Sequence, residues 1–185
     1  MLFRSRLVEK KGIDTLIRAL AELRVRHGIP SNLTIAGDGP ERQRLARLAR
    51  ELACDDSIRW LGSIENTRVR RLLAESDVFA LPCCIDQNGD CDGIPVVLME
   101  AMACGVAVVA GDLPAIRELI RHDVNGALVN ATDVRHVGNQ LANLYRDPTG
   151  RQQLAHQGRR RVETEFSLRG NVDRLEEAFH DTMAA

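Results

Sequence analysis

The chain has 185 residues, of which 44% are hydrophobic and 28% charged, and its formal net charge is -1 at pH 7. This length allows one domain with a full hydrophobic core, and a charge near zero argues against a general nucleic-acid binder. The sequence shows neither a signal peptide nor an apolar run long enough to span a bilayer. The 5 cysteines are odd in number and lack the spacing of a disulfide scaffold, so we expect a reducing, cytoplasmic setting.

The first half of the chain alternates between strand and helix patterns. Residues 2–8 predict a short strand that runs into the charged segment Glu9-Lys10-Lys11-Gly12. A helix with apolar residues every three or four positions follows. Residues 32–36 predict a second strand, and the turn Gly37-Asp38-Gly39-Pro40 separates it from a second helix. Residues 57–61 predict a third strand, with a third helix behind it.

The second half continues the alternation. A fourth strand stops before a long polar loop, residues 83–93, and an apolar helix follows this loop. Two more strands are separated by a further helix. From residue 132 on the pattern is helical, with breaks at Asp147-Pro148 and near Ser167. The fourth to sixth strands are predicted over residues 77–81, 106–110 and 126–129.

Strands that alternate with helices in this way predict right-handed β-α-β units. We therefore expect an α/β fold, a doubly wound, Rossmann-like parallel sheet of six strands in the order 3-2-1-4-5-6. A ligand of such a sheet lies outside the carboxyl ends of the strands, at the switch point between strands one and four. Arg6 and Lys11 follow strand one and Asp92 follows strand four, so these residues are predicted to share one crevice.

The segment over residues 92–100 has a loop half and a helix half. Pro95 suits the first helical position, and Glu100 is the one charged residue in the apolar run over residues 96–104. A buried carboxylate needs a polar partner, so Glu100 is expected to face the crevice unless it lies on a solvated stripe. The free N–H groups at the start of this helix suit an anion. Cations, N–H groups and acids together are the arrangement expected for a nucleotide diphosphate with a sugar attached.

Four motifs, in order, resemble those of the C-terminal, donor-binding domain of retaining glycosyltransferases of family 4, which have the two-domain GT-B fold. The resemblance covers essentially the whole chain. The last motif is an acidic residue, seven residues and a glutamate, and it continues into a small, apolar segment. The motifs are Ser5-Arg6-Leu7-Val8-Glu9-Lys10-Lys11-Gly12, Ala36-Gly37-Asp38-Gly39-Pro40, Ser76-Asp77-Val78-Phe79-Ala80-Leu81-Pro82, and Asp92 to Glu100 with Ala101-Met102-Ala103-Cys104-Gly105.

The resemblance implies roles for individual residues. Arg6 and Lys11 would neutralise the diphosphate of the donor, Asp92 would lie against the donor sugar near the reacting carbon, and Glu100 would bind the ribose hydroxyls. Of these, Arg6, Lys11 and Asp92 are the candidate catalytic groups. Backbone N–H groups of the segment after Asp92 would contact sugar and phosphate. These donor-binding candidates are Gly93, Ile94, Val96 and Val97, together with Gly37, whose segment is either a tight turn or a ligand loop.

The resemblance also implies a reaction, with a sugar passing from a nucleotide diphosphate to a glycan or lipid-linked acceptor with retention at the anomeric carbon. No metal or other cofactor is expected, because the cations and the helix terminus do that work. The acceptor would need an N-terminal domain that this single-domain chain of residues 1–185 lacks. We therefore expect the chain alone to bind nucleotide without turnover, and the full-length protein to be cytoplasmic or membrane-peripheral. The helices from about residue 164 would meet that domain, and Leu168, Val172, Leu175 and Phe179 could support self-association.

Two departures and several alternatives accompany this interpretation. Ser5 replaces the usual glycine, and Asp92 replaces the commoner glutamate, which bears on the choice of sugar. A non-catalytic nucleotide-binding module of the same fold stays open, and Arg6 and Lys11 alone could be a solvated charge cluster. A dinucleotide-dependent oxidoreductase is disfavoured because only Gly12 follows strand one. Zinc is disfavoured because Cys83, Cys84 and Cys91 do not complete a four-ligand set.

Overall fold

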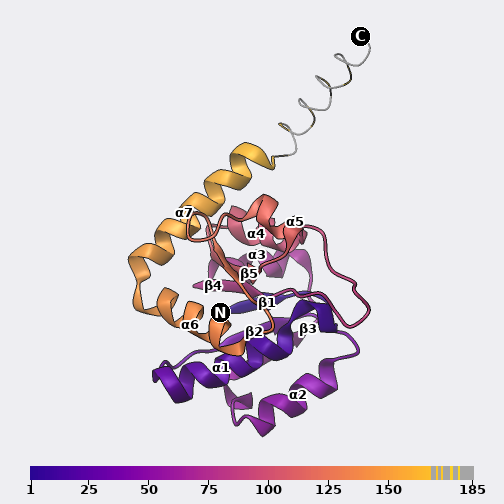
Figure 1. Cartoon of the computed structure of the whole chain (residues 1–185), viewed down its shortest axis with the longest axis vertical. Coiled ribbons are helices and arrows are strands. Elements are labelled where there is room, and N and C mark those ends of the chain that lie inside the picture. Colours follow the sequence, from indigo (N-terminus) through magenta and orange to yellow (C-terminus); the bar gives the residue numbers. More distant parts are fainter. Residues whose placement is uncertain (168–169, 171, 173–175, 177–178, 180–185) are drawn as a thin grey trace.

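The computed structural model contains one six-stranded, all-parallel sheet with the strand order β3-β2-β1-β4-β5-β6 (Figure 1). It describes residues 1–167, 170, 172, 176 and 179. The predicted α/β fold and the predicted strand order are both confirmed. The strands are β1 (Leu2–Arg4), β2 (Leu33–Ala36), β3 (Ile58–Gly62), β4 (Val78–Leu81), β5 (Ala107–Gly111) and β6 (Ala127–Val129).

Helices cover both faces of this sheet. Helix α1 packs against α2 and α6 on one face, and α4 packs against α7 on the other, so that Figure 1 shows α1 and α2 below the sheet and α4 and α5 above it. Both faces being covered, the central strands are almost continuously apolar rather than alternating. The helices are α1 (Ile13–His27), α2 (Arg42–Glu51), α3 (Asn66–Ala74), α4 (Val96–Ala103), α5 (Pro114–Leu119), α6 (Val134–Arg146) and α7 (Pro148–Glu165), with 3-10 turns η1 (Glu9–Lys11) and η2 (Asp55–Ser57).

The core lies where β1 and β4 meet in the middle of the sheet. Leu2 pairs with Thr34 of β2 on one side and with Phe79 of β4 on the other. Phe3 and Phe79 are fully buried. Because β1 has neighbours to both sides and a helix layer above and below, its carboxyl end is fixed in position. The residues that follow β1 therefore start from a rigid point, which is where a doubly wound sheet places its ligand site.

The first strand is shorter than predicted. It ends at Arg4, whereas the sequence indicated a strand through residue 8. The reason is a competition for backbone hydrogen bonds, because Leu7 donates its N–H to Asp38 O at 2.9 Å and accepts from Glu41 N–H at 3.2 Å. The chain after Arg4 thus pairs with the loop after β2 instead of extending the sheet. The short turn η1 then follows, which the hydrophobic pattern did not indicate.

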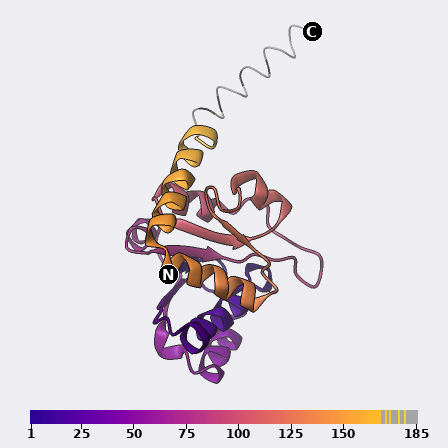
Figure 2. The same cartoon turned by 60° about the vertical axis from the view of Figure 1, so that its left-hand side comes forward.

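Helix α7 runs along the α4 side of the sheet and then extends beyond the body of the domain (Figures 1 and 2). Arg161 fixes the C-terminal part of this helix by donating from Nε to Leu119 O at 2.8 Å and from Nη2 to Glu118 O at 2.7 Å, which satisfies carbonyls at the end of α5. Of the four apolar residues predicted to form an exposed face, Leu168 and Leu175 lie outside the described residues. Val172 and Phe179 are exposed. Among the described helices none has the length and apolar character needed to cross a membrane.

Candidate functional site

A groove of about 570 Å³ lies at the carboxyl ends of β1, β2 and β3, beside the start of α4. This volume is within the range of about 300–1,000 Å³ that is common for small-molecule sites. The groove contains three cations together with residues of the loops after β1, β2 and β3 and of the start of α4. Its lining residues are Arg4, Ser5, Arg6, Lys11, Ala36, Gly37, Asp38, Ser63, Ile64, Pro95, Val96 and Val97. The structure therefore brings together five of the sequence-predicted residues, namely Arg6, Lys11, Gly37, Val96 and Val97.

The cations of the groove come from the last residue of β1, Arg4, and from the segment between β1 and α1. Arg6 is exposed, and no acidic side chain pairs with it within the part of the chain that the structure describes. Lys11 ends η1, and Gly12 directly after it has a left-handed backbone with φ of 62°. A Cβ at Gly12 would lie 1.9 Å from Pro82 O. Only glycine allows this close approach, which holds Lys11 against the end of β4.

Gly37 has a similar steric role on the other wall of the groove. Its φ is 144°, and a Cβ there would lie 1.8 Å from Ser5 O. The loops after β1 and β2 are therefore in direct backbone contact, and Ser5 N–H donates to Ala36 O at 3.2 Å. The two sequence interpretations of this segment are compatible, because the segment is a tight turn and also lines the groove. Ser5, which replaces the usual glycine, takes part in this contact through its backbone.

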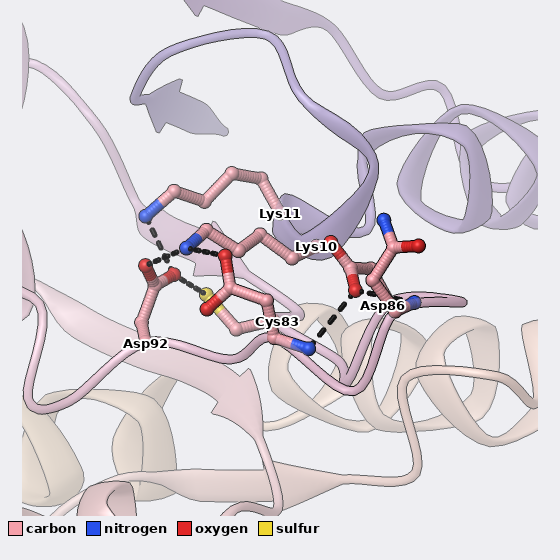
Figure 3. Close-up of polar contacts among 7 residues, drawn as sticks. Lys10, Lys11, Cys83, Asp86 and Asp92 are labelled. Atoms are coloured by element: carbon pink, nitrogen blue, oxygen red, sulfur yellow. Dashed lines mark hydrogen bonds and ion pairs between the residues drawn. The ribbon is translucent and has the colours of Figure 1, made fainter.

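Asp92 lies beside the groove rather than in its lining, and it is held by three side chains (Figure 3). Its Oδ2 atom is 2.6 Å from Lys11 Nζ and 3.5 Å from Cys83 Sγ, and its Oδ1 atom is 3.5 Å from Lys10 Nζ. Lys10 in turn binds Asp90 at 2.7 Å. The side chain of Asp92 is 17% exposed. The sequence indicated that Lys11 and Asp92 share a crevice, and the structure shows that they form an ion pair.

These contacts shift the ionisation of the cluster. Burial by itself would raise the pKa of Asp92, but the hydrogen bond and charge of Lys11, aided by Cys83 and Lys10, outweigh it and hold this pKa below its ordinary value. Burial raises the pKa of Cys83 to about 12, so this thiol stays protonated and donates to the carboxylate. The hydrogen bond that Lys10 donates to Asp90 raises the pKa of Lys10. Asp92 is therefore an ionised acid at neutral pH.

The start of α4 supplies backbone donors to the same place. Pro95 is the N-cap, with φ of -67° and ψ of 121°, rather than the first helical residue as the sequence indicated. Pro95 is the last extended residue, and because its ring replaces the N–H group it cannot donate a backbone hydrogen bond. The helix begins at Val96. The N–H groups of Val96 and Val97 have no acceptor among the described residues, as expected for a first helical turn. Gly93 and Ile94 lie outside the groove lining, with Gly93 exposed and Ile94 half-buried against the core.

Glu100 is not the isolated carboxylate that the sequence indicated. Arg4 Nη1 lies 2.7 Å from Glu100 Oε2, and Arg4 Nη2 donates to Asn66 Oδ1 at 2.9 Å. The polar partner that a carboxylate in an apolar run requires is thus present, but it is a cation from a distant strand, 96 residues earlier in the chain, which the sequence did not identify. Helix α4 is also less enclosed than an all-apolar helix suggests, since Val96 is exposed. Arg4 was missed as a site residue, although a charged residue that closes an apolar strand was a signal in the sequence.

Two further observations concern other candidate sites. A hollow of about 630 Å³, lined by Met1, Asn32, Asp77 and Arg151 among others, lies at the amino ends of β1, β2 and β4. It is at the edge of the sheet opposite to the groove, where a doubly wound fold does not place its ligand. Within the described residues, no group of three or more His, Cys, Asp or Glu side chains is arranged to hold a metal ion.

Comparison with known proteins gives a consistent picture. The family model described as glycosyl transferases group 1 matches residues 1–161. The chain is 39% identical over 146 residues to the GDP-mannose-dependent alpha-(1-6)-phosphatidylinositol monomannoside mannosyltransferase of Mycolicibacterium smegmatis, covering 78% of this chain and 38% of the relative. It is 34% identical over 163 residues to the amylovoran biosynthesis glycosyltransferase AmsK of Erwinia amylovora, covering 88% of this chain and 40% of that relative. The chain thus spans less than half of these curated relatives.

Solved structures show the same fold at low sequence identity. Anabaena Alr3699/HepE, in complex with UDP, superimposes with a TM-score of 0.85 at 23% identity, over 97% of this chain and 48% of that one. The C-terminal domain of the glycosyl transferase group 1 family protein LpcC from Francisella tularensis gives a TM-score of 0.78 at 21% identity, over 90% of this chain and 86% of that one. At these identities the likeness concerns the fold.

Proposed function

Because this chain belongs to the glycosyl transferases group 1 family, we propose that it is the part of a retaining glycosyltransferase that binds the nucleotide-diphosphate sugar. The family predicted from the sequence motifs is confirmed, as is the Rossmann-like fold of the C-terminal domain of GT-B glycosyltransferases. Its relatives include enzymes of polysaccharide biosynthesis. The donor-binding role and the retention of configuration are our proposal.

One observation carries the proposal, namely the set of cations and free backbone N–H groups in the groove. Arg6, Lys11 and the N–H groups of Val96 and Val97 line one cavity, and Arg6 has no acidic partner within the described chain. A diphosphate supplies the negative charge that such a set accommodates. In the transfer step, the bond between the anomeric carbon and the departing phosphate breaks as a bond from that carbon to an acceptor hydroxyl oxygen forms. Negative charge increases on the phosphate, which then takes up the proton of that hydroxyl. The same donors would stabilise this charge without a metal ion.

The two acids would then bind the sugar parts of the donor. Asp92 is held ionised next to Lys11, so we propose that it lies against the transferred sugar near the anomeric carbon. Glu100 is paired with Arg4 on one oxygen, Oε2, and no contact within the described chain occupies its other oxygen. That oxygen is free to accept from ribose hydroxyls. Gly37 lies in the loop after β2, and Gly93 and Ile94 lie between the two acids in the chain; we propose backbone contacts to the donor from these three residues.

The acceptor and the turnover involve more than this chain. Since the chain spans 38% and 40% of two relatives, we propose that a glycan or lipid-linked acceptor is bound by residues outside this sequence. Catalysis depends on holding both reactants in one closed site, so the chain alone should bind donor without steady transfer. Steady transfer by the purified chain to an authenticated acceptor would contradict this. Five free cysteines are consistent with a reducing, cytoplasmic location, which is also part of the proposal.

Calorimetry with UDP, GDP and ADP, and with the corresponding nucleotide sugars, tests the proposal. We expect at least one diphosphate to bind, and Arg6→Ala and Lys11→Ala each to weaken it about tenfold or more, because charge-assisted hydrogen bonds to phosphate are worth roughly 1.5–3 kcal/mol. Added salt should weaken the wild type, and the matching nucleoside without phosphates should hardly respond to either change. If both variants bind the diphosphate as tightly as the wild type, the groove is not the phosphate site.

A further inference from the structure

Lys10 has no role in the function proposed so far, although it belongs to the same cluster as Asp92. The chain has only two lysines, Lys10 and Lys11, and both of them contact this one carboxylate. They do so from opposite oxygens, with Lys11 at Oδ2 and Lys10 at Oδ1 (Figure 3). Asp92 therefore keeps one cation on each oxygen, and the loss of one contact leaves the other in place.

The two lysines differ in what else they reach. Lys11 lines the groove, and Lys10 does not. Under the proposed function Lys11 also binds the diphosphate, so its one ammonium group has to neutralise both a diphosphate and the carboxylate of Asp92. Two acidic groups that share one cation repel each other at short distance, and this repulsion raises the energy of the bound state. A second cation on the far side of Asp92 removes that conflict.

Lys10 is held where this second cation is needed. Its Nζ atom is 2.7 Å from Asp90 Oδ2, and Cys84 N–H donates to its backbone oxygen at 2.9 Å. Asp90 is itself fixed, because its N–H donates to Asp86 Oδ1 at 3.0 Å and its carbonyl accepts from Asp86 N–H at 2.9 Å. The hydrogen bond that Lys10 donates to Asp90 also raises the pKa of Lys10, so that the ammonium is charged at neutral pH. The loop between β4 and α4 and the turn η1 thus form one connected unit.

We propose that Lys10 is a positioning residue, which keeps Asp92 in place and neutralised while Lys11 binds the diphosphate of the donor. This inference rests on the proposed function and adds a residue to it. It distinguishes two kinds of cation in the cluster. Lys11 acts on the ligand directly, and Lys10 acts on the ligand only through Asp92.

A double-mutant cycle on the whole chain tests this distinction. UDP and GDP are titrated by calorimetry into the wild type, Lys10→Met, Asp92→Asn and the double variant, using whichever nucleotide the wild type binds more tightly. We expect Lys10→Met to weaken binding about tenfold in the wild-type background and less than about twofold in the Asp92→Asn background, because without the carboxylate Lys11 has no competing partner. Lys10→Arg should restore most of the affinity. Arg18→Met, which removes an exposed charge of α1 with no contact to Asp92, is the charge-matched control.

The outcomes separate this inference from the function on which it rests. Equal losses in both backgrounds would mean that Lys10 contacts the phosphates directly, and an unchanged Lys10→Met variant would mean that it has no role; either result overturns the inference alone. Failure of the wild type to bind any nucleoside diphosphate overturns the proposed function as well. Thermal melting of each variant confirms that it is folded. If Lys10→Met does not fold, Asp90→Asn takes its place in the cycle, with a smaller loss in the same direction.

Discussion

Asp92 and Glu100 are the two acids of one short motif, and the structure gives them very different surroundings. Asp92 is 17% exposed and is held by two lysines from the turn η1 and by a thiol from the segment just after β4. Glu100 is 39% exposed and has a single cation, Arg4, from the end of β1. Both acids are paired across the switch point of the sheet, one on each side of the first turn of α4.

This difference indicates that the two acids have different roles. A carboxylate with several partners and little solvent is held rigidly, which suits a group placed near reacting atoms. A carboxylate with one partner and an open side can exchange solvent for ligand hydroxyls at little cost. Loss of a partner should therefore destabilise the fold at Asp92, whereas at Glu100 it should mainly alter binding. The predictions below test this contrast.

The largest effect is expected for Lys11→Met. It removes the nearest cation from a carboxylate that has little solvent, so the free energy of unfolding should fall by about 2 kcal/mol. Arg4→Met removes the partner of the more exposed Glu100 and should cost about 1 kcal/mol or less. Urea denaturation measures both. Adding Asp92→Asn to Lys11→Met should restore part of the lost stability, and equal costs for the two single variants would remove the contrast.

The next effect concerns Glu100→Gln. The amide keeps the shape but loses the charge, so the contact with ribose hydroxyls should weaken and nucleotide affinity should fall about tenfold. Stability should change little, because Arg4 keeps Asn66 and water as partners. Calorimetry and thermal melting on the same sample measure the two quantities. Unchanged affinity per folded molecule, together with a lower melting temperature, would show that Glu100 is structural and would remove the ribose assignment.

Acid should act more strongly on the Asp92 side. The pKa of Asp92 is lowered in the folded protein, so its contribution to stability is present above its ordinary value of 3.8 and is lost as the pH falls through the folded value. As the pH falls below about 4, Asp92→Asn should therefore lose less stability than the wild type. Urea denaturation at a series of pH values measures this. Parallel curves for the two proteins would mean that the ion pair with Lys11 contributes nothing to stability.

The smallest effect is expected for the thiol that donates to Asp92. Cys83→Ala removes this hydrogen bond and leaves a small cavity, so the free energy of unfolding should fall by about 1 kcal/mol. Cys104→Ala, at the half-buried end of α4, is the matched control and should change stability by less than about 0.5 kcal/mol. Chemical denaturation resolves the difference. A cost at Cys104 equal to that at Cys83 would assign the effect to packing alone.

The fold could be predicted almost completely from the sequence. Strand boundaries agree within one residue everywhere except in β1, because runs such as those in β4 and β5 are apolar throughout and are bounded by turn residues. The exception has a physical cause. Residues 5–8 have strand-like side chains, but their backbone groups pair with the loop around Asp38, and a hydrophobic pattern does not report which partner a backbone group selects.

The candidate site was predicted less completely. Arg6, Lys11, Gly37, Val96 and Val97 were expected to lie together, and they do, because topology alone brings the carboxyl ends of neighbouring strands to one edge. The partners of the two acids were not predicted. Arg4 reaches Glu100 across 96 positions and Lys11 reaches Asp92 across 81, and such pairs depend on side-chain direction within the assembled loops.

The sequence by itself thus determined the family, the strand order and the place of the groove, since these follow from motifs, hydrophobic periods and the handedness of β-α-β units. Only the tertiary structure decided which cation pairs with which acid and how much solvent each acid keeps. The physical reason is the separation along the chain over which each interaction acts. Periodicity and turn chemistry act between neighbours in the chain, whereas an ion pair forms only when two rigid elements hold their side chains within about 4 Å.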